Sequence, residues 1–316
     1  MTDLRIVNYR AQRGARVGVI AGDEILDVAG LTGVPDDASI GNVMRGWDAA
    51  LQRIREAVEG GRAAPRVPLD AARLLGPVRH GAAIYGAGAN YYGHAREMAE
   101  HAGRPAPADP RTTGQRPWHF LKAPSTVVGD GAYVELPAAA EESLDWEVEL
   151  AAIIGRAAKN VPVEEALGHV AGYTVANDLS ARSLLWRAGL HDSSPFRADW
   201  VLHKNFDGAS PLGPWLVPAA EIADPQDLGL GLKVNGHTMQ SDRTSDMIFT
   251  LAEQIAHLSS HITLTPGDVI LTGTPGGNAA VHGRFLHAGD VVEAWVEGIG
   301  TLTTHIAGDP RKEQQR

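Results

Sequence analysis

The sequence contains no cysteine among its 316 residues. This absence excludes disulfide bonds, a thiolate nucleophile and a zinc site built on thiolates. No apolar run reaches the roughly 18 residues that a membrane helix needs. No N-terminal segment joins a basic stretch to an apolar core, as a secretory signal would. We therefore expect a cytoplasmic protein with no membrane span.

Basic residues are also in deficit. The 28 Lys and Arg residues face 38 Asp and Glu residues, which leaves a formal net charge of −10. This balance argues against a nucleic-acid partner, because such binding depends on basic surfaces. Hydrophobic residues make up 44% of the chain, enough for a sizeable core, and the 36 glycines and 19 prolines favour many short strands and turns.

The first quarter of the chain has its own pattern. Residues 4–29 alternate like three short strands of a meander, and residues 39–59 place apolar residues at helical spacing before the Gly60–Gly61 stop. Residues 64–78 contain three prolines and are expected to form a linker. We therefore predict a small N-terminal domain (1–76), a larger domain (77–308) and a polar tail (309–316).

The larger domain begins with a short buried strand over residues 82–85. Gly86 and Gly88 follow it, but a third glycine and a βαβ unit are missing, so a dinucleotide-binding site is rejected. A helix is expected from Asn90, with His94 and Glu97 on one face. These two residues form either a solvated pair or part of a site. The Pro- and Gly-rich residues 102–117 are expected to form a mobile loop, either a plain connector or a lid.

One acidic strand stands out, with the sequence LDWEVELAAIIG from Leu144 to Gly155. Trp146, Val148 and Leu150 alternate with Asp145, Glu147 and Glu149, so one face is apolar and the other carries three acids. Buried like charges repel unless a cation offsets them. Asp178 lies at the end of a second apolar run and is expected to complete an all-oxygen site for a hard divalent cation. The alternative is a solvated acidic strand face, which the apolar residues 151–154 argue against.

Four later segments complete the expected elements. Asn235–Gly236 predicts a type I′ hairpin turn, and residues 245–262 have the spacing of an amphipathic helix. A buried strand and a Thr/Gly/Pro loop follow over residues 263–277, and a hairpin is expected over residues 289–306 with its turn at 297–300.

Seven segments occur in the order of one known family: GANYYGHAREM, FLKAPSTVVG, LDWEVELAAIIG, GYTVANDLSAR, KNFDGASPLGPW, VNGHTMQSDRTSDMIF and LTPGDVILTGTP. The chain resembles the fumarylacetoacetate hydrolase family from about Ile84 onward, and residues 1–75 resemble the small N-terminal domain of bacterial, acylpyruvase-like members. The resemblance implies an α+β fold that is mainly β: a mixed β-sandwich roll with flanking short helices, plus a small N-terminal α/β domain. It also implies a homodimer.

The resemblance further implies roles for individual residues. Glu147, Glu149 and Asp178 match the family's metal ligands, with Mg²⁺ or Mn²⁺ expected and Ca²⁺ possible in crystals. Asp145 matches no ligand of the family and is expected at the end of the strand, nearer solvent. His94 matches a general base that activates water, Glu97 matches an acid that orients it, and Lys204 matches a lysine that stabilises an enolate. The residues implied in substrate binding are Arg182, Tyr92, Lys122, Gly273 and Thr274.

These roles predict a metal-dependent hydrolase that cleaves a C–C bond in a small anionic 2,4-dioxo acid, of the acylpyruvate or fumarylpyruvate type, through a metal-stabilised enolate. The main alternative is an isomerase, hydratase or decarboxylase of a 2-oxo acid in aromatic or sugar-acid catabolism. A non-catalytic protein with a structural cation is a third alternative, but it would not need His94, Lys204 and Arg182 together. Leu185 stands where many members have a polar group facing the substrate, so the identity of the substrate stays open.

Overall fold

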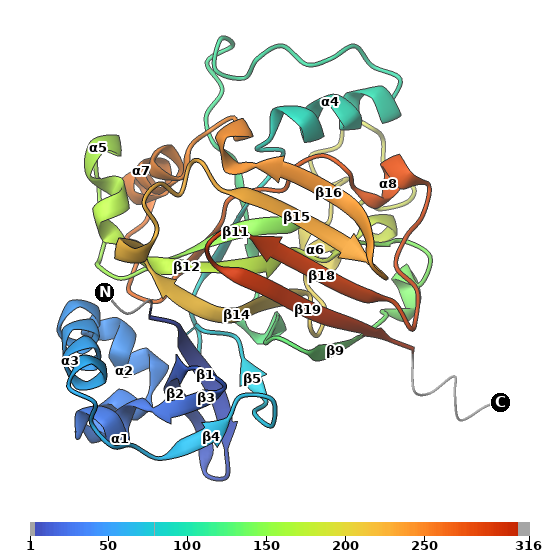
Figure 1. The fold of residues 1–316 in the computed structure, drawn as a ribbon. Coiled ribbons are helices and arrows are strands. Elements are labelled where there is room, and N and C mark those ends of the chain that lie inside the picture. Colours follow the sequence, from blue (N-terminus) through green and yellow to red (C-terminus); the bar gives the residue numbers. More distant parts are fainter. Residues whose placement is uncertain (1–3, 79, 309–316) are drawn as a thin grey trace.

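The computed structural model describes residues 4–78 and 80–308. Its N-terminal unit, coloured blue in Figure 1, lies against one edge of a larger unit built mainly of strands. The two units share a sheet, because Ile6 of β1 pairs antiparallel with Leu216 of β14. The predicted polar tail, 309–316, lies outside the described residues.

The N-terminal unit confirms the predicted meander and corrects two details. The helical pattern is divided at Gly46 into two helices, and the predicted linker contains two short strands that satisfy the sheet edges by pairing with β3 and β1. We retain residue 76, just after the last of these strands, as the proposed domain boundary. The elements are β1 (Ile6–Ala11), β2 (Gly14–Ala21), β3 (Glu24–Asp27), α1 (Val28–Thr32), η1 (Pro35–Ala38), α2 (Ile40–Arg45), α3 (Trp47–Glu59), β4 (Arg66–Pro68) and β5 (Leu74–Leu75).

The larger unit is a sandwich of two mixed sheets. The first continues from the N-terminal unit in the order β1-β14-β12-β11-β17-β6-β7, with β8 beside β14, and the second runs β16-β15-β18-β19-β9. The strands are β6 (Ile84–Ala87), β7 (His119–Lys122), β8 (Val127–Val128), β9 (Ala132–Glu135), β10 (Leu144–Asp145), β11 (Val148–Ile154), β12 (Val170–Asn177), β13 (Ser180–Ala181), β14 (Ser210–Pro218), β15 (Gly229–Val234), β16 (His237–Arg243), β17 (Val269–Leu271), β18 (Val291–Val296) and β19 (Gly300–Ala307). This architecture is the predicted mainly β form of an α+β fold.

Strand β11 is buried on both faces. Val148 and Leu150 face the core between the two sheets, whereas Ala151 and Ile153 belong to a second core that includes side chains of the N-terminal unit. Glu149 shares the face of Ala151 and Ile153, as the period of two requires. The predicted alternation is therefore confirmed over β11, but the predicted single strand is interrupted. Trp146 and Glu147 lie between β10 and β11, and β10 pairs with β13 in a separate two-stranded sheet.

Short helices flank the sandwich (Figure 1). Helix α7 begins at Leu251 instead of residue 245, because Thr250 and Glu253 form a capping box there. The helices are α4 (Tyr92–His101), α5 (Val163–Ala166), α6 (Trp200–Lys204), α7 (Leu251–His261) and α8 (Ala279–His282), with 3₁₀ turns η2 (Pro124–Thr126), η3 (Ala138–Ala140), η4 (Leu167–His169), η5 (Arg182–Leu184), η6 (Ala219–Glu221) and η7 (Thr244–Asp246). None of the helices in the described ranges is long and apolar enough to cross a membrane.

The structure also confirms one predicted turn and one predicted loop. Asn235 and Gly236 both have positive φ, 51° and 79°, as the predicted type I′ turn between β15 and β16 requires. The segment 102–117 contains neither helix nor strand, as predicted.

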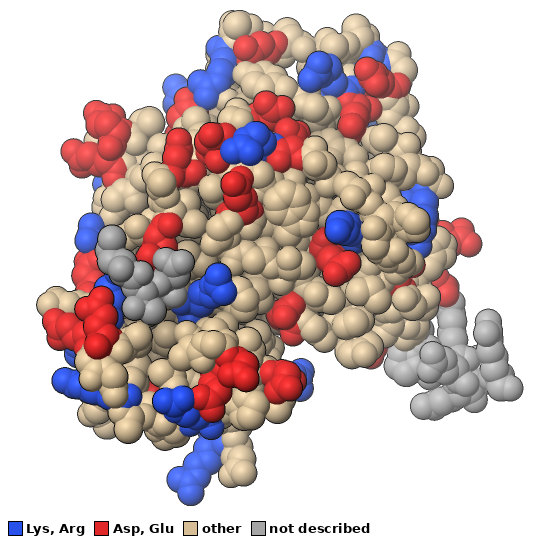
Figure 2. Space-filling view, in the orientation of Figure 1, with Lys and Arg blue, Asp and Glu red and all other residues tan. Residues whose placement is uncertain are grey.

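On the face drawn in Figure 2, the basic side chains lie scattered among acidic ones and form no continuous basic surface over the described residues.

Candidate active site

Three buried carboxylates meet where β11 and β12 leave the first sheet. Glu147 immediately precedes β11, Glu149 lies within it, and Asp178 immediately follows β12. One carboxylate oxygen from each residue lies within 4.8 Å of the other two, and all three residues are at most 5% exposed. The structure thus brings together the three acids that the sequence predicted as metal ligands.

The cluster is electrostatically strained around Glu149. Burial, together with the negative charges of Asp178 and Glu147, raises the pKa of Glu149 well above its usual value. The positive charge of Lys204 opposes this rise, and so does the backbone N–H of Gly273, which donates to Glu149 Oε2 at 2.6 Å. Such a carboxyl group is readily ionised when a cation takes the place of its proton.

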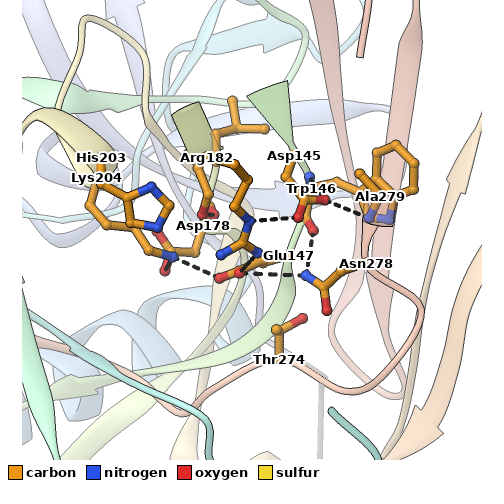
Figure 3. A network of polar contacts seen from close by, with 12 residues as sticks. Asp145, Trp146, Glu147, Asp178, Arg182, His203, Lys204, Thr274, Asn278 and Ala279 are labelled. Carbon is orange, nitrogen blue, oxygen red and sulfur yellow. Dashed lines mark hydrogen bonds and ion pairs between the residues drawn. The ribbon is translucent and has the colours of Figure 1, made fainter. Parts of the chain in front are cut away.

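Two lysines partly offset these acids. Lys204 Nζ donates to Glu147 Oε2 at 2.8 Å and to Asp178 Oδ2 at 2.6 Å, and Lys122 Nζ donates to Asp178 Oδ1 (Figure 3 shows Lys204). Burial opposes the charge of Lys204, but Asp178 and Glu147 outweigh it and raise its pKa. Burial lowers the pKa of Lys122 despite the attraction of Asp178. Lys204 is therefore held charged at the edge of the carboxylate cluster.

Arg182 joins the cluster to Asp145 (Figure 3). Its Nε donates to Asp145 Oδ2 at 2.8 Å, and its terminal nitrogen donates to Glu147 Oε1. Asp145 also accepts the backbone N–H groups of Trp146 and Ala279, each at 2.8 Å. The expectation that Asp145 lies nearer solvent is wrong, since it is 1% exposed. Asp145 fixes the guanidinium and the start of α8, and burial raises its pKa.

His94 reaches the same place from α4. It is 7% exposed, and its Nδ1 has no hydrogen-bond partner among the described residues. Burial lowers its pKa to about 4, against the opposing pull of Glu147, so the imidazole is neutral at physiological pH. A neutral, buried imidazole with a free nitrogen is able to accept a proton.

Glu97 lies one helical turn from His94 but points to another partner. Its Oε2 accepts the backbone N–H of Gly277 at 2.8 Å, and its carboxylate packs on Gly276, where a Cβ would lie 2.6 Å from Oε1. In this structure Glu97 therefore anchors α4 to the loop before α8. The role of orienting His94 stays a prediction.

A cavity of about 530 Å³ opens beside the cluster. Its lining includes His94, Glu147, Arg182, Lys204 and Thr274. A larger cavity of about 900 Å³ lies between the N-terminal unit and the first sheet, and none of the predicted site residues lines it. Five of the predicted site residues therefore line the smaller cavity.

Several predicted substrate-binding residues lie outside this lining. Tyr92 donates its hydroxyl to Asp109 Oδ1 at 3.4 Å, and Gly273 holds Glu149. Lys122 is fully buried and donates to Asp178 and to the carbonyls of Leu179 and Ala209, so it positions a carboxylate. None of these three residues lines the cavity, so their role in substrate binding stays a prediction.

Leu185 is also absent from the lining of the cavity. Its carbonyl accepts the N–H of Asp199 at 2.7 Å, which closes the irregular segment 185–199 over a bridge between Trp186 and Ala198. Leu185 thus belongs to this segment, and other residues form the lining of the cavity.

The segment 102–117 covers one side of the cavity. Pro107, Ala108 and Pro110 line it, and Arg111 fastens the segment by two hydrogen bonds to Glu253, at 2.9 and 2.6 Å, and one to the Ile248 carbonyl at 2.6 Å. This position fits the predicted lid, and its movement stays a prediction.

Sequence reasoning missed two amides that hold the site. Gln240 accepts the N–H of Val148 and donates to Thr274 Oγ1, each at 3.0 Å, and Asn90 donates to the carbonyls of Phe249 and Thr272. No periodicity marks either residue, because a buried amide is recognisable only from the partners that the fold supplies.

The donor set fits a divalent cation. Four acids, Asp145, Glu147, Glu149 and Asp178, face three cations, Lys122, Arg182 and Lys204, which leaves a formal charge of −1 among these described residues. A divalent cation would change this charge to +1 and relieve the repulsion around Glu149. Carboxylate oxygens suit Mg²⁺ or Mn²⁺.

Lys122→Met tests this balance. We expect the metal-free variant to lose about 3–5 kcal/mol of stability, because the substitution removes a buried partner of Asp178. The rise in melting temperature on adding Mn²⁺ should exceed that of the unmodified protein, since the ion replaces the lost charge. Thermal unfolding with Mn²⁺ or EDTA measures both effects, with the exposed Lys159→Met as control. A smaller rise than in the unmodified protein would contradict this account.

Comparison with known proteins identifies the class. The family described as "Fumarylacetoacetate (FAA) hydrolase C-terminal" matches residues 83–307. The chain belongs to this family, which confirms the resemblance seen in its motifs.

Individual relatives differ in their named activities. The chain is 34% identical over 310 residues to the mitochondrial oxaloacetate tautomerase FAHD2B of Bos taurus, covering 96% of this chain and 92% of that protein. It is 31% identical to 5-carboxymethyl-2-hydroxymuconate delta-isomerase from Mycobacterium smegmatis, with a TM-score of 0.70 and coverage of 96% and 100%. It is 28% identical to maleylpyruvate hydrolase from Sphingobium sp. SYK-6, solved with manganese(II) and pyruvate, with a TM-score of 0.73 and coverage of 96% and 99%. The proteins similar to this chain therefore include hydrolases, isomerases and a tautomerase.

Proposed function

We propose that this protein is a divalent-metal-dependent hydrolase that cleaves the C3–C4 bond of a 2,4-dioxo acid. The observation that carries the proposal is the shared cavity: the neutral His94 lines it together with Glu147 of the carboxylate cluster and the charged Lys204. One cavity thus combines a proton acceptor with carboxylates that can bind a cation. The manganese and pyruvate in the related maleylpyruvate hydrolase support the same pairing of metal and 2-oxo acid.

Each group has a defined task in this reaction. A bound divalent cation would act as a Lewis acid toward the negative charge that develops on the 2-oxo group. His94 takes a proton from water as the water oxygen bonds to C4. When the C3–C4 bond breaks, its electron pair remains with C3 and delocalises to the 2-oxygen, near Lys204. Return of the proton from His94 to C3 then yields a 2-oxo acid and a second carboxylic acid.

A direct assay tests the reaction. Incubated with Mn²⁺ and acetylpyruvate (2,4-dioxopentanoate), the protein should release pyruvate and acetate in equal amounts. EDTA should reduce this release to the background rate, because the carboxylate cluster alone leaves the site with a net negative charge. Product formation can be followed by NMR. If the substrate remains intact across a series of 2,4-dioxo acids, the hydrolytic assignment is wrong.

Tautomerisation of a 2-oxo acid is the second candidate. It is favoured by the similarity to oxaloacetate tautomerase and by the position of Glu97, which bonds Gly277 instead of His94. Tautomerisation moves a proton between carbon and oxygen and needs no water at C4. Faster conversion of enol to keto oxaloacetate, without cleavage of any 2,4-dioxo acid, would select this candidate.

A further inference from the structure

Three aromatic side chains form one side of the cavity. The Trp118 and Trp200 ring centroids lie 4.7 Å apart, those of Phe120 and Trp200 lie 5.4 Å apart, and those of Trp118 and Phe120 lie 5.9 Å apart. Each ring thus contacts the other two at distances typical of aromatic packing. All three residues line the cavity, and we refer to them as the aromatic wall.

Two glycines leave space for the rings of the aromatic wall to pack against the backbone. A Cβ at Gly86 would lie 2.4 Å from the Phe120 ring, and one at Gly88 would lie 2.2 Å from the Trp118 ring. No larger residue fits at either position without moving a ring. The two glycines that failed as a dinucleotide fingerprint therefore have a different purpose, which is to admit aromatic rings against the backbone at the end of β6.

The aromatic wall lies next to the charged residues of the site. Lys204 Nζ lies 4.8 Å from the Phe120 ring centroid and also bonds the carboxylates of Glu147 and Asp178. A ligand whose anionic end lies at the cation-binding end of the cavity therefore extends along the rings. Trp118 is 47% exposed and Met98, which also lines the cavity, is 52% exposed, so this ligand would cover apolar surface that water now contacts.

The charges in the cavity favour an apolar end over a second carboxylate. Arg182 and Lys204 are already paired with acids of the cluster. The remaining cation in the described lining is Arg116, an exposed residue of the segment 102–117. A distal carboxylate would find one solvated partner, whereas an aryl group would find three packed rings.

We propose that the aromatic wall selects substrates whose C4 substituent is an aryl or comparably bulky apolar group. This inference rests on the proposed function for the position of the 2-oxo acid end, and it names the substrate class. The preferred substrates are aroylpyruvates, ahead of short acylpyruvates and dicarboxylates.

Equilibrium binding separates this inference from catalysis. Three 2-oxo acids that lack the 4-oxo group, and so cannot undergo the proposed hydrolysis, are titrated calorimetrically into the protein with Mn²⁺. They are 2-oxo-4-phenylbutanoate, 2-oxopentanoate and the dicarboxylate 2-oxopentanedioate. We expect the phenyl ligand to bind at least roughly tenfold more tightly than 2-oxopentanoate, as filling an apolar pocket requires.

Variants localise the preference. Trp118→Leu should reduce it to less than about threefold, whereas Trp118→Phe should retain most of it, because the ring is kept. Trp186→Leu is the matched control: Trp186 is similarly exposed, at 54%, but lies outside the cavity. Arg116→Gln should leave the order of the three affinities unchanged. Circular dichroism confirms that each variant is folded.

The outcomes distinguish the two proposals. Tightest binding of the dicarboxylate, lost in Arg116→Gln, overturns the aromatic wall as the selector. Equal affinities in the unmodified protein also overturn it and leave the proposed function intact. A phenyl preference lost in Trp118→Leu supports it even if no 2,4-dioxo acid is cleaved, in which case only the hydrolytic assignment fails. If no 2-oxo acid binds with Mn²⁺, both proposals fall.

Discussion

Glu149→Gln is expected to abolish metal-dependent turnover and, at the same time, to stabilise the metal-free protein. The amide oxygen can still accept the N–H of Gly273, so the local packing is retained. The anionic ligand is lost, and we expect affinity for Mn²⁺ to fall by more than roughly 100-fold, since changes to supporting residues alone cost 10- to 100-fold. Metal-dependent product release should fall to the background rate.

The gain in stability follows from the pKa of Glu149. Burial and the neighbouring acids raise this pKa, so the ionised side chain opposes folding. Its folded-state pKa exceeds its unfolded value, so metal-free wild-type stability is lost as the pH rises through the folded pKa. The glutamine variant lacks this titration, and its metal-free melting temperature should equal or exceed that of the wild type at pH 8.

Thermal unfolding with and without Mn²⁺ measures both effects. In the wild type, Mn²⁺ at about 100 times its Kd adds about 2.7 kcal/mol of stability, and in Glu149→Gln at the same concentration this gain should nearly vanish. The exposed Glu142→Gln is the control and should behave as wild type. An undiminished Mn²⁺ shift in Glu149→Gln would mean that the ion binds elsewhere.

Much of the fold and of the metal cluster could be predicted from local pattern. A strand has a period of two, so the alternation in residues 144–150 fixed which side chains share a face with Glu149. The Asn235–Gly236 turn was recognisable because few residues tolerate positive φ. Asp178 was recognisable because it ends a second buried run. Each of these signals lies within a few residues of the feature that it predicts.

The remaining features depend on partners distant in sequence. Asp145 was expected near solvent because nothing close to it in sequence reveals Arg182 or the N–H of Ala279. Lys122 ends a short strand, where many surface lysines lie, and its burial against Asp178 joins positions 56 residues apart. Glu97 is likewise paired with Gly277 only through the packing of α4 on a loop near α8. Such contacts are set by the sandwich as a whole.

The aromatic wall shows the same limit. Trp118 immediately precedes β7 and Phe120 lies within it, two residues along the chain, but Trp200 comes from α6 and meets them only in the folded chain. Gly86 and Gly88 resembled part of a dinucleotide-binding motif. A glycine pair indicates that some group packs closely against the backbone, but it does not indicate which group. The structure shows that the groups packed against these glycines are the aromatic rings of Phe120 and Trp118.

His94→Gln is expected to lower kcat for hydrolysis by roughly 10²–10⁴-fold, which is the range for removing a well-placed general base. Affinity for Mn²⁺ should be unchanged, because His94 donates to none of the three carboxylates among the described contacts. The loss should be similar at pH 6 and pH 8, since burial lowers the pKa of His94 to about 4 and the wild-type imidazole is neutral at both.

His101→Gln provides the matched control for this substitution. It makes the same change at an exposed position at the end of the same helix and should leave kcat unaltered. Metal-dependent exchange of the C3 protons of pyruvate in D₂O adds a second measurement, because exchange needs the enolate but no water at C4. Retained exchange with lost hydrolysis in His94→Gln would place the histidine at the water. Loss of both would assign His94 to proton transfer at C3, which is the step that a tautomerase uses.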